Sequence, residues 1–219
     1  MTERIGLFGG TFDPVHNGHL RAAAEVRAAF ALERVLFIPS YIPPHKESRG
    51  MAPAADRLRM VELACLGHQG YVASAIEVEA RERSYSILTL AKVKAIYPGA
   101  RLFFILGVDA FLEIGTWREY ERVLDECRFI VTSRPGFDLE AGAEVLGGRL
   151  RERVCRAGSG GPVDEAQLEL CGVFLLPIPA LDISATGVRE RIRRGEDPEG
   201  LVPPVVAAYI REHHLYSEP

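Results

Sequence analysis

Hydrophobic residues recur along the chain in two distinct patterns. Short continuous runs of isoleucine, valine, leucine and phenylalanine are separated by longer stretches in which apolar residues return every third or fourth position. A short apolar run predicts a buried strand, and the longer spacing predicts an amphipathic helix. Strands are expected at residues 4–9, 34–39, 71–79, 101–107, 128–133 and 173–178, and helices at residues 18–30, 55–66, 84–97, 117–126, 182–195 and 202–216.

The order of these elements predicts the fold class. Strands and helices that alternate along a chain are typical of a Rossmann-like, doubly wound α/β fold, with a mostly parallel sheet and helices on both faces. We expect one domain over residues 1–219, with a small helical part at 184–219 and only helix and loop between Gly136 and Cys171. Such sheets bind ligands beyond the carboxyl ends of their strands, so motifs that follow strands are the first candidates for a site.

Composition and charge narrow the classes of partner. Hydrophobic residues make up 47% of the 219 residues and charged residues 26%, which is ordinary for a globular protein. The formal net charge of -4 argues against a nucleic-acid partner, because a protein that binds nucleic acid generally needs a basic face. No apolar run approaches the roughly 20 residues that span a bilayer, so we expect no membrane partner and a cytoplasmic location. The sequence leaves open whether the protein is a monomer or a homo-oligomer.

Cysteine usage fits the same compartment. Cys65, Cys127, Cys155 and Cys171 are widely spaced and form no CxxC pair. We therefore expect four reduced thiols, most of them in the core.

The first candidate motif, GGTFDPVHNGH, follows the first predicted strand directly. Gly9 and Gly10 permit a tight turn and a close approach of the backbone to a ligand. His16 and His19 lie three positions apart where a helix begins, so both imidazoles can face one side and donate hydrogen bonds to phosphate oxygens.

Chemistry limits the other interpretations of this motif. An isolated HxxH is more often a surface or capped histidine pair. A zinc site needs three or four protein ligands, and no cysteine or carboxylate completes a recognisable spacing. The chain has neither a GxxxxGK[ST] loop nor a GxGxxG fingerprint, which removes the P-loop and the ordinary dinucleotide-binding interpretations.

The second candidate motif, DISATGVRERIRRG, follows the last predicted strand. Ser184 or Thr186 can cap a helix whose first turn exposes N–H donors, and Val188 would face the core. Arg189 then lies within a turn of the positive helix end, where dipole and guanidinium can act on one anion. The alternative is an amphipathic helix with arginines on its solvated face.

At these two motifs the sequence resembles the HxGH nucleotidyltransferase superfamily, and the string GGTFDPVHNGH is especially similar to the bacterial nicotinate mononucleotide adenylyltransferases. The resemblance implies that both histidines contact the nucleotide phosphates and that the ISxTxxR element holds the phosphates that leave as pyrophosphate. His16, His19 and Arg189 would then be catalytic. ATP would be bound by Gly9, Gly10, Thr11, Phe12, His16, His19, Gly107, Arg134, Ile183, Ser184, Thr186 and Arg189.

Between the two motifs lie features that resemble the acceptor pocket of that family. By the resemblance Trp117 stacks on the pyridine ring, Asp109 holds the ribose, Lys46 approaches a phosphate, and the backbone at Tyr85 and Ser86 receives the nicotinate carboxylate. The chain has Ser86 where many members of the family have threonine. Taken singly, each feature has an ordinary explanation: a tryptophan in the core, an aspartate that caps a helix, a solvated turn. Arg134 fits a stack on adenine or ribose and also a plain surface arginine.

The expected reaction joins ATP to nicotinate mononucleotide and releases pyrophosphate. Mg²⁺ would be held by ATP oxygens and water, and no protein metal ligand is expected. Nicotinamide mononucleotide or phosphopantetheine as the acceptor, and a catalytically silent nucleotide-binding module, remain the alternatives.

Overall fold

The structure is a computed structural model that describes residues 2–43, 50–158, 162–179 and 181–217. Its strands are β1 (Arg4–Gly10), β2 (Arg34–Pro39), β3 (Tyr71–Ala73), β4 (Arg101–Gly107), β5 (Arg128–Thr132), β6 (Val154–Arg156) and β7 (Val173–Leu176). Its helices are α1 (Asn17–Phe30), α2 (Ala54–Cys65), α3 (Ile76–Ala80), α4 (Ser86–Ile96), α5 (Val108–Phe111), the 3₁₀ turn η1 (Ile114–Thr116), α6 (Tyr120–Glu126), α7 (Ala141–Glu144), α8 (Gly148–Arg151), α9 (Glu165–Leu170), α10 (Ala185–Arg193) and α11 (Pro204–Glu212).

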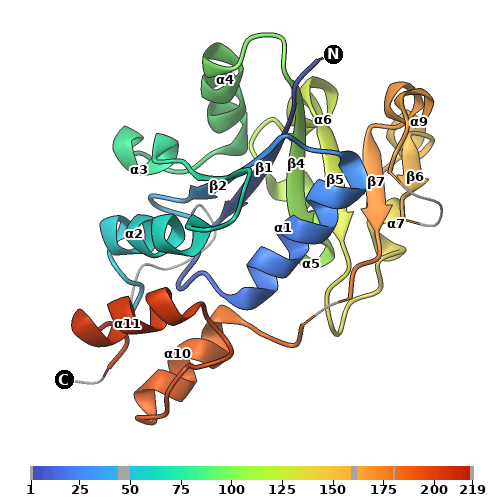
Figure 1. The fold of residues 1–219 in the computed structure, drawn as a ribbon. Coiled ribbons are helices and arrows are strands. Elements are labelled where there is room, and N and C mark those ends of the chain that lie inside the picture. Colours follow the sequence, from blue (N-terminus) through green and yellow to red (C-terminus); the bar gives the residue numbers. More distant parts are fainter. Residues whose placement is uncertain (1, 44–49, 159–161, 180, 218–219) are drawn as a thin grey trace.

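The strands form one parallel sheet in the order β3-β2-β1-β4-β5-β7-β6 (Figure 1). The chain builds outward from β1 to β3 and then returns to place β4 on the other side of β1. Strand order therefore reverses between β1 and β4, where a doubly wound sheet opens a crevice at its carboxyl edge. The predicted Rossmann-like fold class is confirmed.

Helices cover both faces of this sheet, as Figure 1 shows. One core lies under α1, α2, α10 and α11 and includes the buried Phe30, Phe37 and Phe174. The other lies under α4, α5 and α6 and includes Leu90 and Phe129. The strands are nearly continuous apolar runs because residues on both sides of the pleat are buried.

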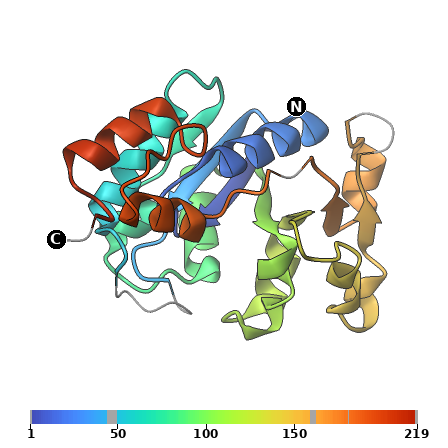
Figure 2. The same ribbon diagram turned by 90° about the horizontal axis from the view of Figure 1, so that it is seen from below.

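The last two helices lie across the carboxyl edge of the sheet. After β7 the chain passes beside α1, enters α10 and ends in α11 against α2 (Figure 2). The hydroxyl of Tyr209 in α11 donates to Asp56 Oδ1 in α2 at 2.8 Å, and Asn17 N donates to Leu201 O at 2.8 Å. The second motif is thereby held next to the first.

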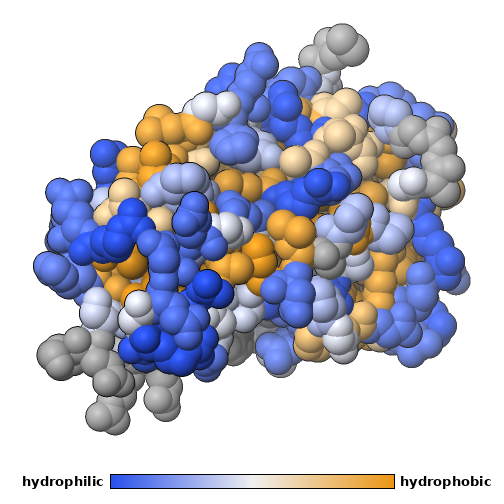
Figure 3. All heavy atoms as spheres, turned by 60° about the horizontal axis from the view of Figure 1, so that its bottom comes forward, coloured by the Kyte–Doolittle hydropathy of each residue, from blue (hydrophilic) through white to orange (hydrophobic). Residues whose placement is uncertain are grey.

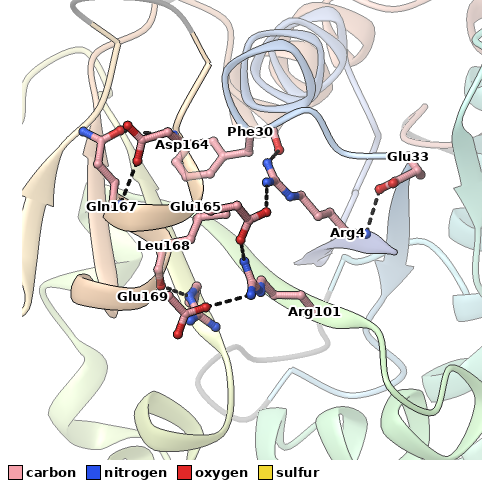
Figure 4. Close-up of polar contacts among 10 residues, drawn as sticks. Arg4, Phe30, Glu33, Arg101, Asp164, Glu165, Gln167, Leu168 and Glu169 are labelled. Atoms are coloured by element: carbon pink, nitrogen blue, oxygen red, sulfur yellow. Dashed lines mark hydrogen bonds and ion pairs between the residues drawn. The ribbon is translucent and has the colours of Figure 1, made fainter. Parts of the chain in front are cut away.

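Ion pairs link three elements at the opposite, amino edge (Figure 4). Arg4 of β1 and Arg101 of β4 both reach Glu165 of α9, and Arg101 also contacts Glu169 at 2.8 Å. Arg128 Nε donates to Leu168 O at 2.7 Å. These groups satisfy one another and join α9 to the amino ends of β1, β4 and β5.

Three sequence expectations need correction. The strand expected at residues 71–79 ends at Ala73, and helix α3 follows. The stretch from Gly136 to Cys171 contains a strand, β6, beside its helices and loops. Cys155 and Cys171 form a disulfide with their Cα atoms 5.9 Å apart, so the prediction of four reduced thiols is wrong for this pair. Cys65 and Cys127 are free, and burial raises the pKa of Cys127 to about 12.

No helix among the described residues is both long enough and apolar enough to cross a membrane.

Candidate active site

Two adjoining clefts open at the carboxyl edge of the sheet, where the strand order reverses. We name them the histidine cleft, of about 540 Å³, and the tryptophan cleft, of about 570 Å³. Figure 3 shows this side of the molecule, with hydrophobic residues exposed between strongly hydrophilic ones. Both clefts are lined by Gly9, Gly10, Thr11, Leu106, Ala110 and Glu113. The loop that follows β1 is thus a shared wall.

Packing beneath that loop explains its shape. Phe12 adopts a left-handed φ of 48° and turns its buried ring onto Phe8 and His19, with ring centroids 5.8 and 5.0 Å away. A side chain on Gly10 would meet the Phe12 ring at 3.2 Å. Phe12 was predicted to bind ATP, yet its ring belongs to the core and its side chain lines neither cleft.

The two histidines of the first motif lie together in the histidine cleft. Their rings stack with centroids 3.6 Å apart, and His16 N donates to His19 Nδ1 at 3.2 Å. A nitrogen that accepts a hydrogen bond carries no proton, so neutral His19 holds its proton on Nε2. A side chain on Gly18 would meet His16 Nδ1 at 3.0 Å, which accounts for the glycine between the two histidines.

His16 is neutral at physiological pH. Its ring is only 6% exposed, and burial together with the charge of Arg134 lowers its pKa from 6.5 to about 4. His16 Nδ1 is buried and has no hydrogen-bond partner among the described residues. A buried polar atom without a partner costs free energy, and a bound ligand can remove that cost.

An ion pair between residues that follow two neighbouring strands also lines the histidine cleft. Asp109 Oδ2 lies 2.8 Å from Arg134 Nη1, and Asp109 Oδ1 would touch any side chain at Gly107, at 2.5 Å. Gly107 ends β4 and Arg134 follows β5, so the sheet sets their positions. Asp109 was predicted on the acceptor side. The structure places it in the histidine cleft with the residues predicted for ATP.

The second motif reaches the first through Arg189. Ser184 caps α10, where its Oγ accepts from Gly187 N at 3.1 Å. Arg189 Nη1 donates to Asp13 O at 2.7 Å, and Nη2 donates to Thr186 Oγ1 at 3.2 Å. Of this motif, Ile183 lines the histidine cleft. The guanidinium therefore lies against the loop that carries the histidines.

Sequence reasoning missed the polar groups buried under this loop. Arg57 is 1% exposed and donates to the backbone oxygens of Thr11, Ser40, Tyr41 and Ala52. The loops after β1 and β2 are thereby tied to α2. Asp13, inside the quoted motif, could have been singled out by its place there. Arg57 carries no local signal, because it looks like one more charged residue of an amphipathic helix.

The tryptophan cleft has a different chemistry. Trp117 is partly buried and packs edge-on against Phe104, with centroids 5.6 Å apart. Tyr85 and Ser86, the N-cap and the first residue of α4, line the same cleft, and the Arg118 guanidinium lies 5.2 Å from the Tyr85 ring centroid. The buried Ser40 Oγ has no hydrogen-bond partner among the described residues. The cleft thus offers one aromatic face with polar donors around it.

Most of the predicted site residues that the structure describes are brought together. Gly9, Gly10, Thr11, His16, His19, Gly107, Asp109, Arg134 and Ile183 line the histidine cleft, and Tyr85, Ser86 and Trp117 line the tryptophan cleft. Ser184, Thr186 and Arg189 line neither cleft, and of the three it is Arg189 that contacts Asp13 in the loop after β1. Lys46 lies outside the described residues.

The described part of the chain contains no group of three or more histidine, cysteine, aspartate or glutamate residues that could hold a metal ion. The one buried acid beside the histidines, Asp13, already accepts from Ala52 N and from Tyr216 Oη.

A fold with this strand order, histidines at the first crevice and an arginine supplied by a late helix defines a nucleotidyltransferase. The sequence profile of the Cytidylyltransferase-like family matches residues 7–191, and the chain belongs to that family.

More similar relatives narrow the assignment. A protein of Solibacter usitatus named "Probable nicotinate-nucleotide adenylyltransferase" is 45% identical, covering 98% of this chain and 100% of that protein. A protein of the same name from Citrifermentans bemidjiense is 40% identical, covering 98% and 99%. Within the superfamily, the chain belongs to the nicotinate-nucleotide adenylyltransferases, so the family expected from its motifs is confirmed.

The fold is shared with a distant solved structure. Plasmodium falciparum nicotinic acid mononucleotide adenylyltransferase, complexed with NaAD, superposes with a TM-score of 0.71 at 19% identity, covering 98% of this chain and 97% of that chain.

Proposed function

We propose that the chain transfers the adenylyl group of ATP to nicotinate mononucleotide and so produces deamido-NAD and pyrophosphate. One observation carries the proposal: two clefts of different chemistry share a wall at the end of β1. One can hold phosphates and the other an aromatic ring. The names of relatives that match over their full length support the same reaction.

ATP occupies the histidine cleft in this proposal. His19 Nε2 and His16 are the donors at the phosphates, and Arg189 approaches from α10. Thr11 and the glycines beside it let the backbone come close to the triphosphate. Arg134 contacts adenine or ribose, and its ion pair with Asp109 can exchange for a contact with the sugar.

The mononucleotide occupies the tryptophan cleft. Its pyridine ring stacks on Trp117, and its carboxylate lies at the start of α4. The first N–H groups of any helix have no partner within it and carry partial positive charge. Arg83 and Arg118 line this cleft beside Glu77 and Glu113, and we place the carboxylate toward the two guanidinium groups. Lys46 is proposed to meet the phosphate, and Asp109 the ribose where the clefts join.

The chemistry needs alignment and charge stabilisation more than a strong base. A phosphomonoester has its second pKa near ~6, so the attacking oxygen is already an anion at neutral pH. That oxygen forms a bond to the α-phosphorus of ATP, and the bond from the α-phosphorus to the pyrophosphate oxygen breaks. Placing both groups in line contributes on the order of 7–11 kcal/mol, and the histidines and Arg189 offset the growing charge.

A divalent metal accompanies the nucleotide, and we propose Mg²⁺. Mg²⁺ keeps most of its water and would be held mainly by the phosphate oxygens of ATP. When bound, it neutralises phosphate charge.

The test is pyrophosphate release by purified protein with Mg-ATP. Nicotinate mononucleotide, nicotinamide mononucleotide and phosphopantetheine are compared by kcat/KM. We expect nicotinate mononucleotide to be preferred by at least about tenfold, since its carboxylate meets cationic groups that an amide does not need. A preference for either other acceptor would refute the assignment, and ATP binding without turnover on any of them would favour a silent module.

A further inference from the structure

A segment that lines neither cleft contacts the loop after β1. After α11 the chain turns back at Leu215 and Tyr216, both of which pack partly buried against the core under α1. The Tyr216 hydroxyl donates to Asp13 Oδ1 at 2.7 Å. Tyr216 itself lines neither cleft.

The backbone of this segment is strained to make the contact. His214 and Tyr216 have φ values of 51° and 65°, in the left-handed region that side chains other than glycine's rarely adopt. Such strain persists only where surrounding contacts hold it. The hydrogen bond to Asp13 is a polar contact that holds Tyr216 in place. Burial, and to a lesser degree the charge of Asp13, raises the pKa of Tyr216, so its hydroxyl stays a donor.

Asp13 is also the residue that holds Arg189. It is 5% exposed. Its backbone oxygen accepts from Arg189 Nη1 at 2.7 Å, and its Oδ2 lies 3.6 Å from the same nitrogen. Its Oδ1 accepts from Tyr216 and from Ala52 N, at 3.0 Å for the latter. One side of the carboxylate is thus fixed by Tyr216, while the other faces the guanidinium.

We propose that Tyr216 is a positioning residue, which acts through Asp13 to set the place of Arg189 beside the nucleotide phosphates. The inference rests on the proposed function only for what Arg189 binds. Without the hydroxyl, Asp13 Oδ1 loses one of the two donors named above and keeps Ala52 N, so the carboxylate shifts toward Arg189 and draws the guanidinium away from the phosphates.

The experiment uses the Tyr216→Phe variant of the full chain, with Tyr209→Phe as its matched control. Tyr209 also donates its hydroxyl to a carboxylate, that of Asp56, and neither residue lines either cleft. A hydrogen bond to a charged group corresponds to about a tenfold change in an equilibrium. We expect Tyr216→Phe to raise the KM for Mg-ATP about tenfold with the KM for nicotinate mononucleotide little changed, and Tyr209→Phe to match the wild type in both constants.

A double-mutant cycle separates positioning from general support of the fold. The dissociation constant of inorganic pyrophosphate, measured by calorimetry, needs no turnover. It is compared among wild type, Tyr216→Phe, Arg189→Ala and the double variant. If Tyr216 acts through Arg189, the double variant binds pyrophosphate no more weakly than Arg189→Ala alone.

Two results of this cycle would overturn the inference. One is a double variant in which the separate fold-changes in the dissociation constant multiply. The other is a wild type that does not bind pyrophosphate. A Tyr216→Phe variant that only lowers the thermal midpoint and kcat would also overturn the inference. A wild type that binds pyrophosphate but forms no dinucleotide would instead refute the proposed function, and the cycle would still report on the Tyr216–Arg189 coupling.

Discussion

The two edges of the sheet use similar residue types in opposite ways. At the amino edge, Arg4, Arg101 and Glu165 pair with one another and with their neighbours (Figure 4). At the carboxyl edge, some buried side-chain atoms of the described residues have no hydrogen-bond partner. In the described part of the chain there are four such atoms, and three of them, His16 Nδ1, Ser40 Oγ and Asp109 Oδ1, line the two clefts.

We interpret the paired groups as supports of the fold and the unpaired ones as groups that a ligand would contact. An unpaired buried polar atom costs about 1–3 kcal/mol, so a fold retains several in one place only if something repays the cost. Exposed ion pairs contribute about 0–1 kcal/mol and bind nothing further. Substitutions at the carboxyl edge should therefore change catalysis, and substitutions at the amino edge should change stability slightly.

The largest effect is expected at His19. His19→Ala removes a donor placed where charge develops, so kcat should fall by about 100- to 1000-fold while the KM for ATP changes less. Steady-state kinetics measures both constants. Arg101→Gln, at the amino edge, is the control and should keep wild-type kcat. A folded His19→Ala enzyme with near wild-type turnover would remove His19 from the mechanism.

His16 should make stability depend on pH. Its pKa is lowered from 6.5 to about 4, so between these values the unfolded chain binds more protons than the folded one. Stability should therefore fall as pH drops from about 6.5 to 4, by about 3 kcal/mol in total from this group. Urea unfolding at a series of pH values measures it.

Other acidic groups titrate in the same pH range. The contribution of His16 is therefore taken as the difference between wild type and His16→Gln in how the free energy of unfolding depends on pH. His16→Gln should lose this part of the pH dependence of the free energy of unfolding. His68→Gln, at an exposed turn, should keep it. An unchanged slope in His16→Gln would show that the histidine is not buried in its neutral form.

Trp117 should affect only the acceptor. Stacking of an aromatic ring on a base contributes about 1–3 kcal/mol, so Trp117→Ala should raise the KM for nicotinate mononucleotide by about 5- to 100-fold. The KM for ATP should stay unchanged, and Trp117→Phe should recover most of the loss. Equal increases in both KM values would mean that the clefts are not separate.

The smallest effect is expected at the amino edge. Arg101→Gln should lower the free energy of unfolding by no more than about 1 kcal/mol, because its partners are exposed, and the difference should shrink in high salt. Denaturant unfolding at low and high salt checks this. A loss of several kcal/mol would show that the ion pairs are a main support of the fold.

The sequence predicted the elements that are determined by short stretches of the chain. The apolar runs of β1, β4 and β5 are long enough to identify buried strands, and HxGH carries its own turn. Residues 76–79 were misassigned to a strand because Ile76 and Val78 alternate as in a strand, and the five-residue helix α3 is too short to reveal a helical period.

Contacts made only by tertiary structure gave no such signal. Arg57 and Tyr216 reach the histidine loop from elements far along the chain, and nothing in their own segments distinguishes them. Cys155 and Cys171 are brought together by the pairing of β6 with β7, at a sequence separation of 16 that resembles no short cysteine motif.

The most direct test of the two-cleft account is a crystal structure of the protein with deamido-NAD bound. The account predicts the pyridine ring against Trp117, the adenosine in the histidine cleft and the diphosphate at the shared wall of Gly9 to Thr11. A dinucleotide lying wholly in one cleft, or with its pyridine ring away from Trp117, would contradict it.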